Sequence, residues 1–307
     1  MLIDVSPNLK RPAMNIAELF FLAAIWGASF LFMRVGTPEF GPVPLIALRV
    51  GIAALVLLPV LRSAAARGHV RSKAWPLLVV GVTNSALPFS LFAYSTLYLN
   101  AGFDAILNAT VPLWTGLIAF VWLKTPMSRP QVIGMLVGMA GVVTLVSDKI
   151  GSSMPGVWLA IAAVLLATLS YGFAINYSKT RLAGVPPFVV ACGSQVAATI
   201  VLLPLAILYW PTAPVSATAW YSVLALGVVC TGIAYVIFYR LLEHVGSAYA
   251  ASVTFLIPIF GVIWGAIFLK EEVTPTMVAG CLIVLLGTAL ATGKLNLSSY
   301  LGDKAAK

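Results

Sequence analysis

Residues Tyr239–Gly287 read YRLLEHVGSAYAASVTFLIPIFGVIWGAIFLKEEVTPTMVAGCLIVLLG, and they repeat a pattern that the chain already carries between Tyr94 and Gly141. Moving the earlier copy forward by 146 residues superposes identical or similar residues at the same spacing. The matched pairs are Asn108 with Thr254, Pro112 with Pro258, Lys124 with Lys270, Gly134 with Gly280 and Gly141 with Gly287. With a shift of 145 residues the match continues toward the N-terminus, where Trp26-Gly27 meets Tyr171-Gly172. The chain is therefore predicted to consist of two copies of one design.

The composition indicates a membrane protein. Hydrophobic residues make up 61% of the 307 residues and charged residues only 9%, and the mean hydropathy is +1.03. One soluble core cannot hide that much apolar surface. Crossing a bilayer takes about 20 mainly apolar residues per helix, and the long continuous apolar runs favour helices over the strands of a barrel. We therefore predict an all-α polytopic protein with membrane lipid as its solvent.

Ten apolar runs have the length of a membrane span. They cover residues 16–35, 43–61, 75–98, 102–123, 130–147, 156–178, 187–209, 218–241, 246–269 and 276–293. The first five spans form one repeat at 16–147 and the last five a second at 156–293, with a connector at 148–155 and tails at 1–15 and 294–307. Because each repeat holds an odd number of spans, the second must enter the membrane from the opposite side. The repeats are therefore predicted to be inverted copies.

The basic residues are distributed unevenly between the two ends of these spans. Of the 18 Lys and Arg residues, fourteen lie on the side that holds both termini, three lie on the other side, and Arg49 lies within a span. This asymmetry predicts cytoplasmic N- and C-termini, and it accounts for the net charge of +9 without a nucleic-acid partner. Arg49 has two interpretations. It is either an anchor at the outer leaflet or for backbone carbonyls, or a residue at the mouth of a cavity.

Polar residues inside the predicted spans are candidates for solute binding, although such residues also serve packing and interface anchoring. Here they are amides, hydroxyls, phenols and indoles. Ser90 and Tyr94 lie four residues apart, as do their counterparts Tyr235 and Tyr239, so each pair shares one helix face. The residues expected to line a central cavity are Trp26, Ser90, Tyr94, Asn108, Trp114, Tyr171, Asn176, Tyr235, Tyr239 and Thr254.

Several other chemistries are disfavoured. The nine acidic residues all fall in tails, loops or helix ends, so no proton-carrying carboxylate is expected at mid-membrane. The sequence has no nucleophile–base pair, phosphate-binding loop or metal-ligand spacing. Cys192, Cys230 and Cys281 are expected to be packing residues. The first apolar run has spanning length and no small-x-small cleavage site after it, so it is expected to remain as a span. We expect no enzymatic activity, metal or cofactor.

A series of short motifs recurs in order in the two halves. They are Trp26-Gly27 in the first span, Arg49 in the second, the Pro112 and Pro258 helices, and LKEE at Leu269–Glu272 followed by Gly280 and Gly287. Together they resemble the two EamA-type repeats of the drug/metabolite transporter (DMT) superfamily, over residues 16–293. The resemblance implies a central cavity built from the first, third, fourth, sixth, eighth and ninth spans, with the fifth and tenth outside it. Thr125 departs from the family, which often has Glu there; this residue is expected to cap a helix end without changing the solute.

That family includes exporters of amino acids and other metabolites, so the resemblance implies export across the bacterial inner membrane. A cavity of Trp, Tyr and Asn suits a small neutral or zwitterionic solute, and the lack of a mid-depth basic cluster disfavours sugar phosphates. We expect an amino-acid or similar metabolite exporter that works by alternating access, as a monomer or weak dimer, driven by the gradient of its own solute. The alternatives are a multidrug, cation or nucleoside exporter of the same fold, and a membrane scaffold or receptor that transports nothing.

Overall fold

The computed structural model describes residues 12–151 and 154–294, and these are helical apart from short connections. The helices are α1 (Pro12–Phe40), α2 (Pro42–Leu57), α3 (Ala64–Ser72), α4 (Ala74–Gly81), α5 (Leu87–Ser95), α6 (Ala101–Asn108), α7 (Val111–Leu123), α8 (Arg129–Ser147), α9 (Val157–Arg181), α10 (Pro187–Leu208), α11 (Ala217–Leu224), α12 (Ala234–Val245), α13 (Ser247–Ala250), α14 (Val253–Leu269) and α15 (Pro275–Ala291). A 3₁₀ segment, η1 (Leu58–Arg62), and two π segments, η2 (Val82–Ala86) and η3 (Ala225–Ile233), connect some of them. Most of the predicted tails and part of the connector, and with them the predicted location of the termini, lie outside the described residues.

The described residues contain eight helical segments that are long and apolar enough to cross a membrane. They are Met14–Phe40, Pro42–Arg62, Ala74–Ser95, Ala101–Leu123, Arg129–Ser147, Val157–Arg181, Pro187–Leu208 and Ala217–Val245. The apolar helices α14 and α15 have 17 residues each, which is close to the lower limit of about 17 for a spanning helix. The all-helical membrane architecture is confirmed, and the count of ten spans stays a prediction.

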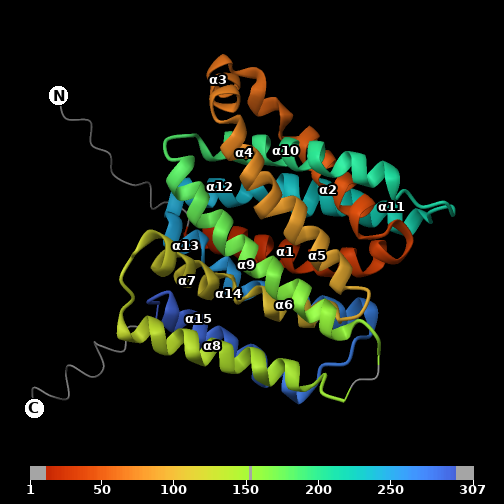
Figure 1. The fold of residues 1–307 in the computed structure, drawn as a ribbon, viewed down its shortest axis with the longest axis vertical. Coiled ribbons are helices and arrows are strands. Elements are labelled where there is room, and N and C mark those ends of the chain that lie inside the picture. Colours follow the sequence, from red (N-terminus) through yellow and green to blue (C-terminus); the bar gives the residue numbers. More distant parts are fainter. Residues whose placement is uncertain (1–11, 152–153, 295–307) are drawn as a thin grey trace, which may run out of the picture.

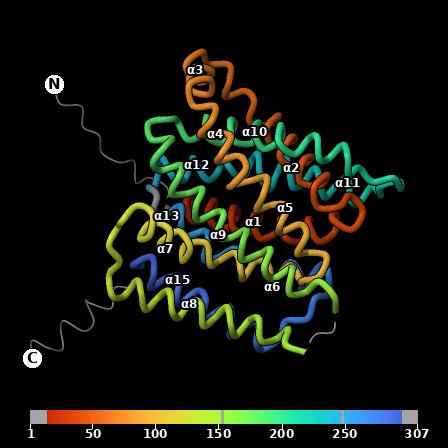
Figure 2. The backbone as a smooth tube through the Cα atoms, in the orientation of Figure 1, coloured from red at the N-terminus to blue at the C-terminus, as the bar shows by residue number. Residues whose placement is uncertain are grey.

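The helices lie side by side in one bundle (Figures 1 and 2), with α8 and α15 along one edge and α3, α4 and α10 at the opposite edge. Helix α1 crosses the interior, where it contacts α14, α11 and α12, while α9 contacts α5 and α7. We call the end of the bundle at which α1 and α5 end and α6 begins the distal end. The positive-inside asymmetry predicts that the distal end faces away from the cytoplasm.

Glycine residues bring α8 and α15 into backbone contact at the edge of the bundle. A Cβ atom added at Gly287 would lie 2.2 Å from the backbone nitrogen of Gly138, and one added at Gly134 would lie 2.3 Å from that of Ala291. Only glycine allows such an approach, as in other small-residue contacts between membrane helices. These two helices carry none of the predicted solute-binding residues, as expected for the fifth and tenth spans.

Two of the predicted spans bend at equivalent places in the two halves. The π segment η2 interrupts the span Ala74–Ser95, and η3 interrupts the span Ala217–Val245. A wide turn frees backbone carbonyls that other groups must satisfy. The Ser170 hydroxyl of α9 donates to the Thr83 carbonyl over 2.7 Å, and the Thr231 hydroxyl donates to the Leu226 carbonyl over 2.8 Å. The bends are therefore built into the packing of the bundle.

Three predicted segments differ in detail from the structure. The span predicted at 102–123 is present as the apolar segment Ala101–Leu123, but it is interrupted between α6 and α7, because Pro112 at the start of α7 lacks the N–H that would continue the helix from Asn108. The span predicted at 246–269 is likewise divided into α13 and α14. The basic connection after the second span contains the short helix α3, whose Ala66 packs with Leu77 and Leu182.

Candidate functional site

Arg49 of α2 lies inside the bundle, with only 4% of its surface exposed. Its Nε donates to the Thr231 hydroxyl of η3 over 3.0 Å, its Nη1 lies 3.6 Å from the Met33 sulfur of α1, and the guanidinium carbon lies 3.8 Å from the centroid of the Phe89 ring of α5. Arg49 therefore joins α1, α2, α5 and η3 from an interior position. Its predicted roles, as an anchor at the outer leaflet or for backbone carbonyls, or at the mouth of a cavity, stay predictions.

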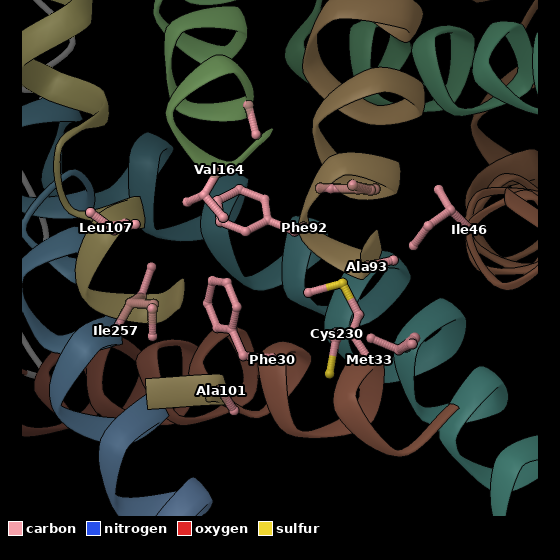
Figure 3. Packing of buried hydrophobic residues seen from close by; sticks show 14 of the residues in the cluster. Phe30, Met33, Ile46, Phe92, Ala93, Ala101, Leu107, Val164, Cys230 and Ile257 are labelled. Atoms are coloured by element: carbon pink, nitrogen blue, oxygen red, sulfur yellow. The ribbon is translucent and has the colours of Figure 1, made fainter. Parts of the chain in front are cut away.

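No carboxylate among the described residues pairs with Arg49. Its Nη2 donates no hydrogen bond within the same part of the chain. A buried charge normally has a partner, because removing it from water is costly. Apolar side chains pack around this region, and Figure 3 shows Met33, Phe92 and Cys230 among them. Arg49 is thus a positive charge in an apolar interior, and its Nη2 group can still donate hydrogen bonds.

Two of the predicted tyrosines lie beside this charge. The phenols of Tyr171 and Tyr235 are close enough to the Arg49 guanidinium to interact with it electrostatically. The Tyr171 ring lies 6.3 Å from the Phe89 ring and 6.2 Å from the Phe92 ring, between centroids. Tyr235 stacks on Tyr239, with centroids 6.0 Å apart, as their spacing on one helix face predicts. Arg49, Tyr171, Tyr235 and Tyr239 form the central site.

Trp26 connects α1 to this site through two aromatic contacts. Its ring centroid lies 5.4 Å from that of Phe238, and Phe238 lies 5.5 Å from Tyr239. All of the predicted aromatic residues mentioned so far are partly exposed rather than sealed. They come from α1, α9 and α12, three of the elements that were expected to build a central cavity.

The other predicted residues lie apart from Arg49 or have local partners. Tyr94 pairs with Tyr98, with ring centroids 5.2 Å apart. Asn176 uses its amide to donate to the carbonyls of Thr115 and Gly172, each over 2.9 Å, and so ties α9 to α7. Thr254 donates to the Ala251 carbonyl over 2.8 Å.

Three predicted residues offer polar groups without a partner among the described residues. The Ser90 hydroxyl and the Trp114 indole N–H are buried and unpaired, and the amide of half-buried Asn108 forms no hydrogen bond within that part of the chain. Buried polar groups are normally hydrogen-bonded. Their unused hydrogen-bond donors and acceptors are therefore available to a solute or to water. The roles of all ten predicted residues in solute binding stay predictions.

Sequence reasoning missed a second polar cluster, at the distal end. The Glu271 carboxylate, just after α14, accepts from the backbone N–H groups of Ala101 and Gly102, over 3.0 and 3.4 Å, at the start of α6. It also lies 4.0 Å from Nε of Arg34 on α1, and Nη1 of Arg34 donates to the Thr96 carbonyl. An acid at a helix N-terminus satisfies free N–H groups and the helix dipole. This cluster fastens α1, α5, α6 and α14 together.

Asp104 belongs to the same region and corrects the expectation that every acid is peripheral. It lies in the first turn of α6, which is a helix end as predicted, but it is completely buried, with 0% of its surface exposed. The sequence contained a signal for this, since Arg34, Asp104 and Glu271 all fall at the same predicted end of the spans and the distal side carries few charges. Helix-end position alone does not establish exposure.

Replacing Glu271 by alanine is expected to lower the free energy of unfolding by about 1–2 kcal/mol, because the N-terminus of α6 loses its cap. Glu272→Ala is the matched control, since Glu272 is exposed and forms no ion pair with the described residues. Thermal unfolding of the purified protein in detergent measures both. An equal effect of the two substitutions would contradict the capping role.

A bundle of membrane-length helices around buried polar residues is the architecture of a multi-pass membrane protein. The chain belongs to the EamA-like transporter family, which matches residues 15–147 and 158–293. This confirms the resemblance seen in the sequence motifs. Members of that family are membrane transporters of small solutes.

Several relatives are similar along most of their length. The uncharacterized transporter YvbV of Bacillus subtilis (strain 168) is 28% identical over 287 residues, which cover 90% of each chain. A probable terminal-alkyne amino-acid exporter of Streptantibioticus cattleyicolor is 26% identical over 277 residues, 89% of this chain and 91% of its own. A protein of known crystal structure shares the fold, with a TM-score of 0.65 and 19% identity, over 92% of this chain and 99% of its own.

Proposed function

We propose that this transporter exports small carboxylate-bearing metabolites, with amino acids as the leading class, across the bacterial inner membrane. The observation that carries the proposal is the unpaired Arg49 beside Tyr171 and Tyr235. A guanidinium with a free Nη2 binds a carboxylate by charge-assisted hydrogen bonds. Nearby aromatic faces, from Tyr235, Tyr239 and Trp26, suit an ammonium group. An α-amino acid carries both groups, and one relative is named as an amino-acid exporter.

The proposed mechanism is alternating access between two inverted five-helix repeats, at 16–147 and 156–293, with ten spans in all. Two observations support it. The family matches the chain twice, and the π segments η2 and η3 occupy equivalent places in the two halves. Repeats of opposite orientation give two related packings, one open to each side, around a site at their interface. Arg49 of the first half bonds to Thr231 of the second, so it lies at that interface.

A multidrug or cation exporter of the same fold is the competing function. The fixed charge of Arg49 disfavours it, because a cationic solute in the central site would lie next to a like charge in an apolar surrounding. A nucleoside carries no carboxylate, so it would leave the buried charge of Arg49 without a counter-charge.

Counterflow in liposomes tests the proposal. Purified protein in vesicles loaded with unlabelled solute is expected to accumulate a subset of labelled amino acids, with saturable kinetics. Amino-acid amides, which keep the ammonium group and lack the carboxylate, are the matched control and are expected to exchange poorly. Exchange of cationic dyes or nucleosides, with silence across the amino acids, would contradict the proposed solute and leave the fold untouched.

A further inference from the structure

Asp104 is a completely buried acid that the proposed transport site does not use. Its exposed surface is 0%, and its Oδ1 has no hydrogen-bond partner among the described residues. The other oxygen, Oδ2, lies 2.5 Å from the Ser95 hydroxyl oxygen at the end of α5. An ionised carboxylate with an unsatisfied oxygen in an apolar interior is strongly disfavoured.

The two contacts of the Ser95 hydroxyl indicate that the Asp104 carboxyl carries a proton. Its oxygen lies 2.7 Å from the Phe92 carbonyl oxygen as well as 2.5 Å from Asp104 Oδ2. A hydroxyl carries one hydrogen, and a carbonyl and a carboxylate both only accept. One hydrogen shared between two acceptors makes two weak bonds, whereas both of these distances are as short as those of strong hydrogen bonds. Both contacts become hydrogen bonds if the acid O–H of Asp104 donates to Ser95 and Ser95 donates to the Phe92 carbonyl.

The surrounding charges agree with a neutral acid. The charged groups that reach Asp104 are Glu271, after α14, and Arg34 of α1. These two neutralise each other across 4.0 Å, so an ionised Asp104 would add an unbalanced negative charge. Helices α14 and α15 contain no charged residue, and α9 carries its two, Lys179 and Arg181, at the other end of the bundle. Lys149, which lies on the far side of Phe103, is already paired with Asp148 over 3.1 Å and so does not balance the charge of Asp104.

We propose that Asp104 is a proton-binding site of the distal end. One proton binds when α1, α5, α6 and α14 come together, as the contacts of Arg34 and Glu271 hold them here, and it leaves when they separate. The same contacts that close the distal end bury the acid. Separation would admit water to the carboxyl, and hydration favours the ionised form. Protonation and closure are therefore linked, and acid on the distal side favours the closed state. This proposal differs from the expectation, from the sequence, of transport without any proton-carrying carboxylate.

Infrared spectroscopy of the purified protein tests the proton site without any knowledge of the solute. At neutral pH in deuterated buffer, the protein is expected to show a carboxylic-acid carbonyl band that Asp104→Asn removes. Asn is a close mimic of the neutral acid, because its amide can donate to Ser95 as the acid does. Ser95→Ala is expected to keep the band and shift it, since the acid loses its hydrogen-bond acceptor. A spectrum with no acid band that depends on Asp104 or Ser95 would overturn the proposal.

The linkage to closure rests on the proposed alternating access and is measured in the same vesicles. Counterflow by the unmodified protein is expected to slow as the pH on the distal side falls, by at most about tenfold per pH unit for one linked proton. The Asp104→Asn variant is expected to exchange solute slowly, at a rate that does not depend on the pH on the distal side. The same pH dependence in both proteins would overturn the linkage. Absence of exchange by the unmodified protein, with the acid band present, would instead count against the proposed solute.

Discussion

Replacing Arg49 by methionine is expected to reduce exchange of carboxylate-bearing solutes at least about thirtyfold while leaving the fold as stable as before. The solute would lose the only cation of the central site, and loss of one member of a buried charge pair costs about 2–5 kcal/mol of binding. The apo protein behaves differently. Its Arg49 is buried at 4% exposure with no anionic partner, and methionine fills a similar volume without the cost of desolvating a charge.

Counterflow and thermal unfolding of the same purified sample measure the two effects. Arg49→Lys keeps the charge and loses the planar fork, and is expected to retain part of the exchange activity. Arg71→Met, in the exposed helix α3, is the matched control and is expected to leave both quantities unchanged. If Arg49→Met unfolds the protein and Arg49→Lys restores stability and exchange in proportion, Arg49 is a structural residue and the carboxylate site is wrong.

The substitution Gly287→Ala is expected to lower the free energy of unfolding by about 2–3 kcal/mol, which is large for one methyl group. The new Cβ would lie 2.2 Å from the Gly138 nitrogen and 2.4 Å from its Cα, and backbone atoms cannot rotate away as a side chain can. Helices α8 and α15 would have to separate along their whole contact.

Gly116→Ala is the matched control for this prediction, because an added Cβ there has no neighbour within 4 Å. Alanine is the better helix former, so this change is expected to be neutral or to stabilise by up to about 1 kcal/mol. Thermal unfolding in detergent compares the two variants. Similar melting temperatures for the two variants would contradict the prediction, because they would show that α8 and α15 can move apart at little cost in stability.

The sequence predicted the parts of this fold that depend on hydrophobic length and on repeated spacing. The apolar runs located the helices, and the repeated spacing matched Gly134 and Gly141 with Gly280 and Gly287, which lie on the two helices that pack together at the edge. The π segments could not be predicted. Val82–Ala86 carries polar residues, but polar residues within a span do not specify a wider turn. The Thr83 carbonyl of η2 is satisfied by Ser170 from α9, and in η3 the Thr231 hydroxyl bonds within the segment. The division of 102–123 was foreseeable from Pro112 but was not made.

The site was predicted in the same partial way. The i,i+4 spacing of Tyr235 and Tyr239 predicted that they share one helix face, since this depends on one helix only, and the structure shows the two rings stacked there. The setting of Arg49 and the burial of Asp104 depend on which helices pack against α2 and α6, and a single sequence contains no direct signal of those neighbours. Asn176 was predicted to bind the solute, but its amide donates hydrogen bonds to the backbone carbonyls of Thr115 and Gly172. That use of the amide also depends on which helix packs against α9.

The turns after α7 and α14 have the same backbone but different chemistry. Lys124 and Lys270 both adopt left-handed conformations, with φ of 54° and 55°, and the next residue in each case donates its N–H six residues back, over 3.1 Å. Only the second turn continues with an acid, Glu271, which caps α6, whereas Thr125 in the first is exposed. A carrier with perfectly matched halves would have two isoenergetic resting orientations. Under the proposed alternating access, the Glu271 cap of about 1–2 kcal/mol would remove that degeneracy and favour, by about five- to thirtyfold, the empty form in which α14 is held to α6.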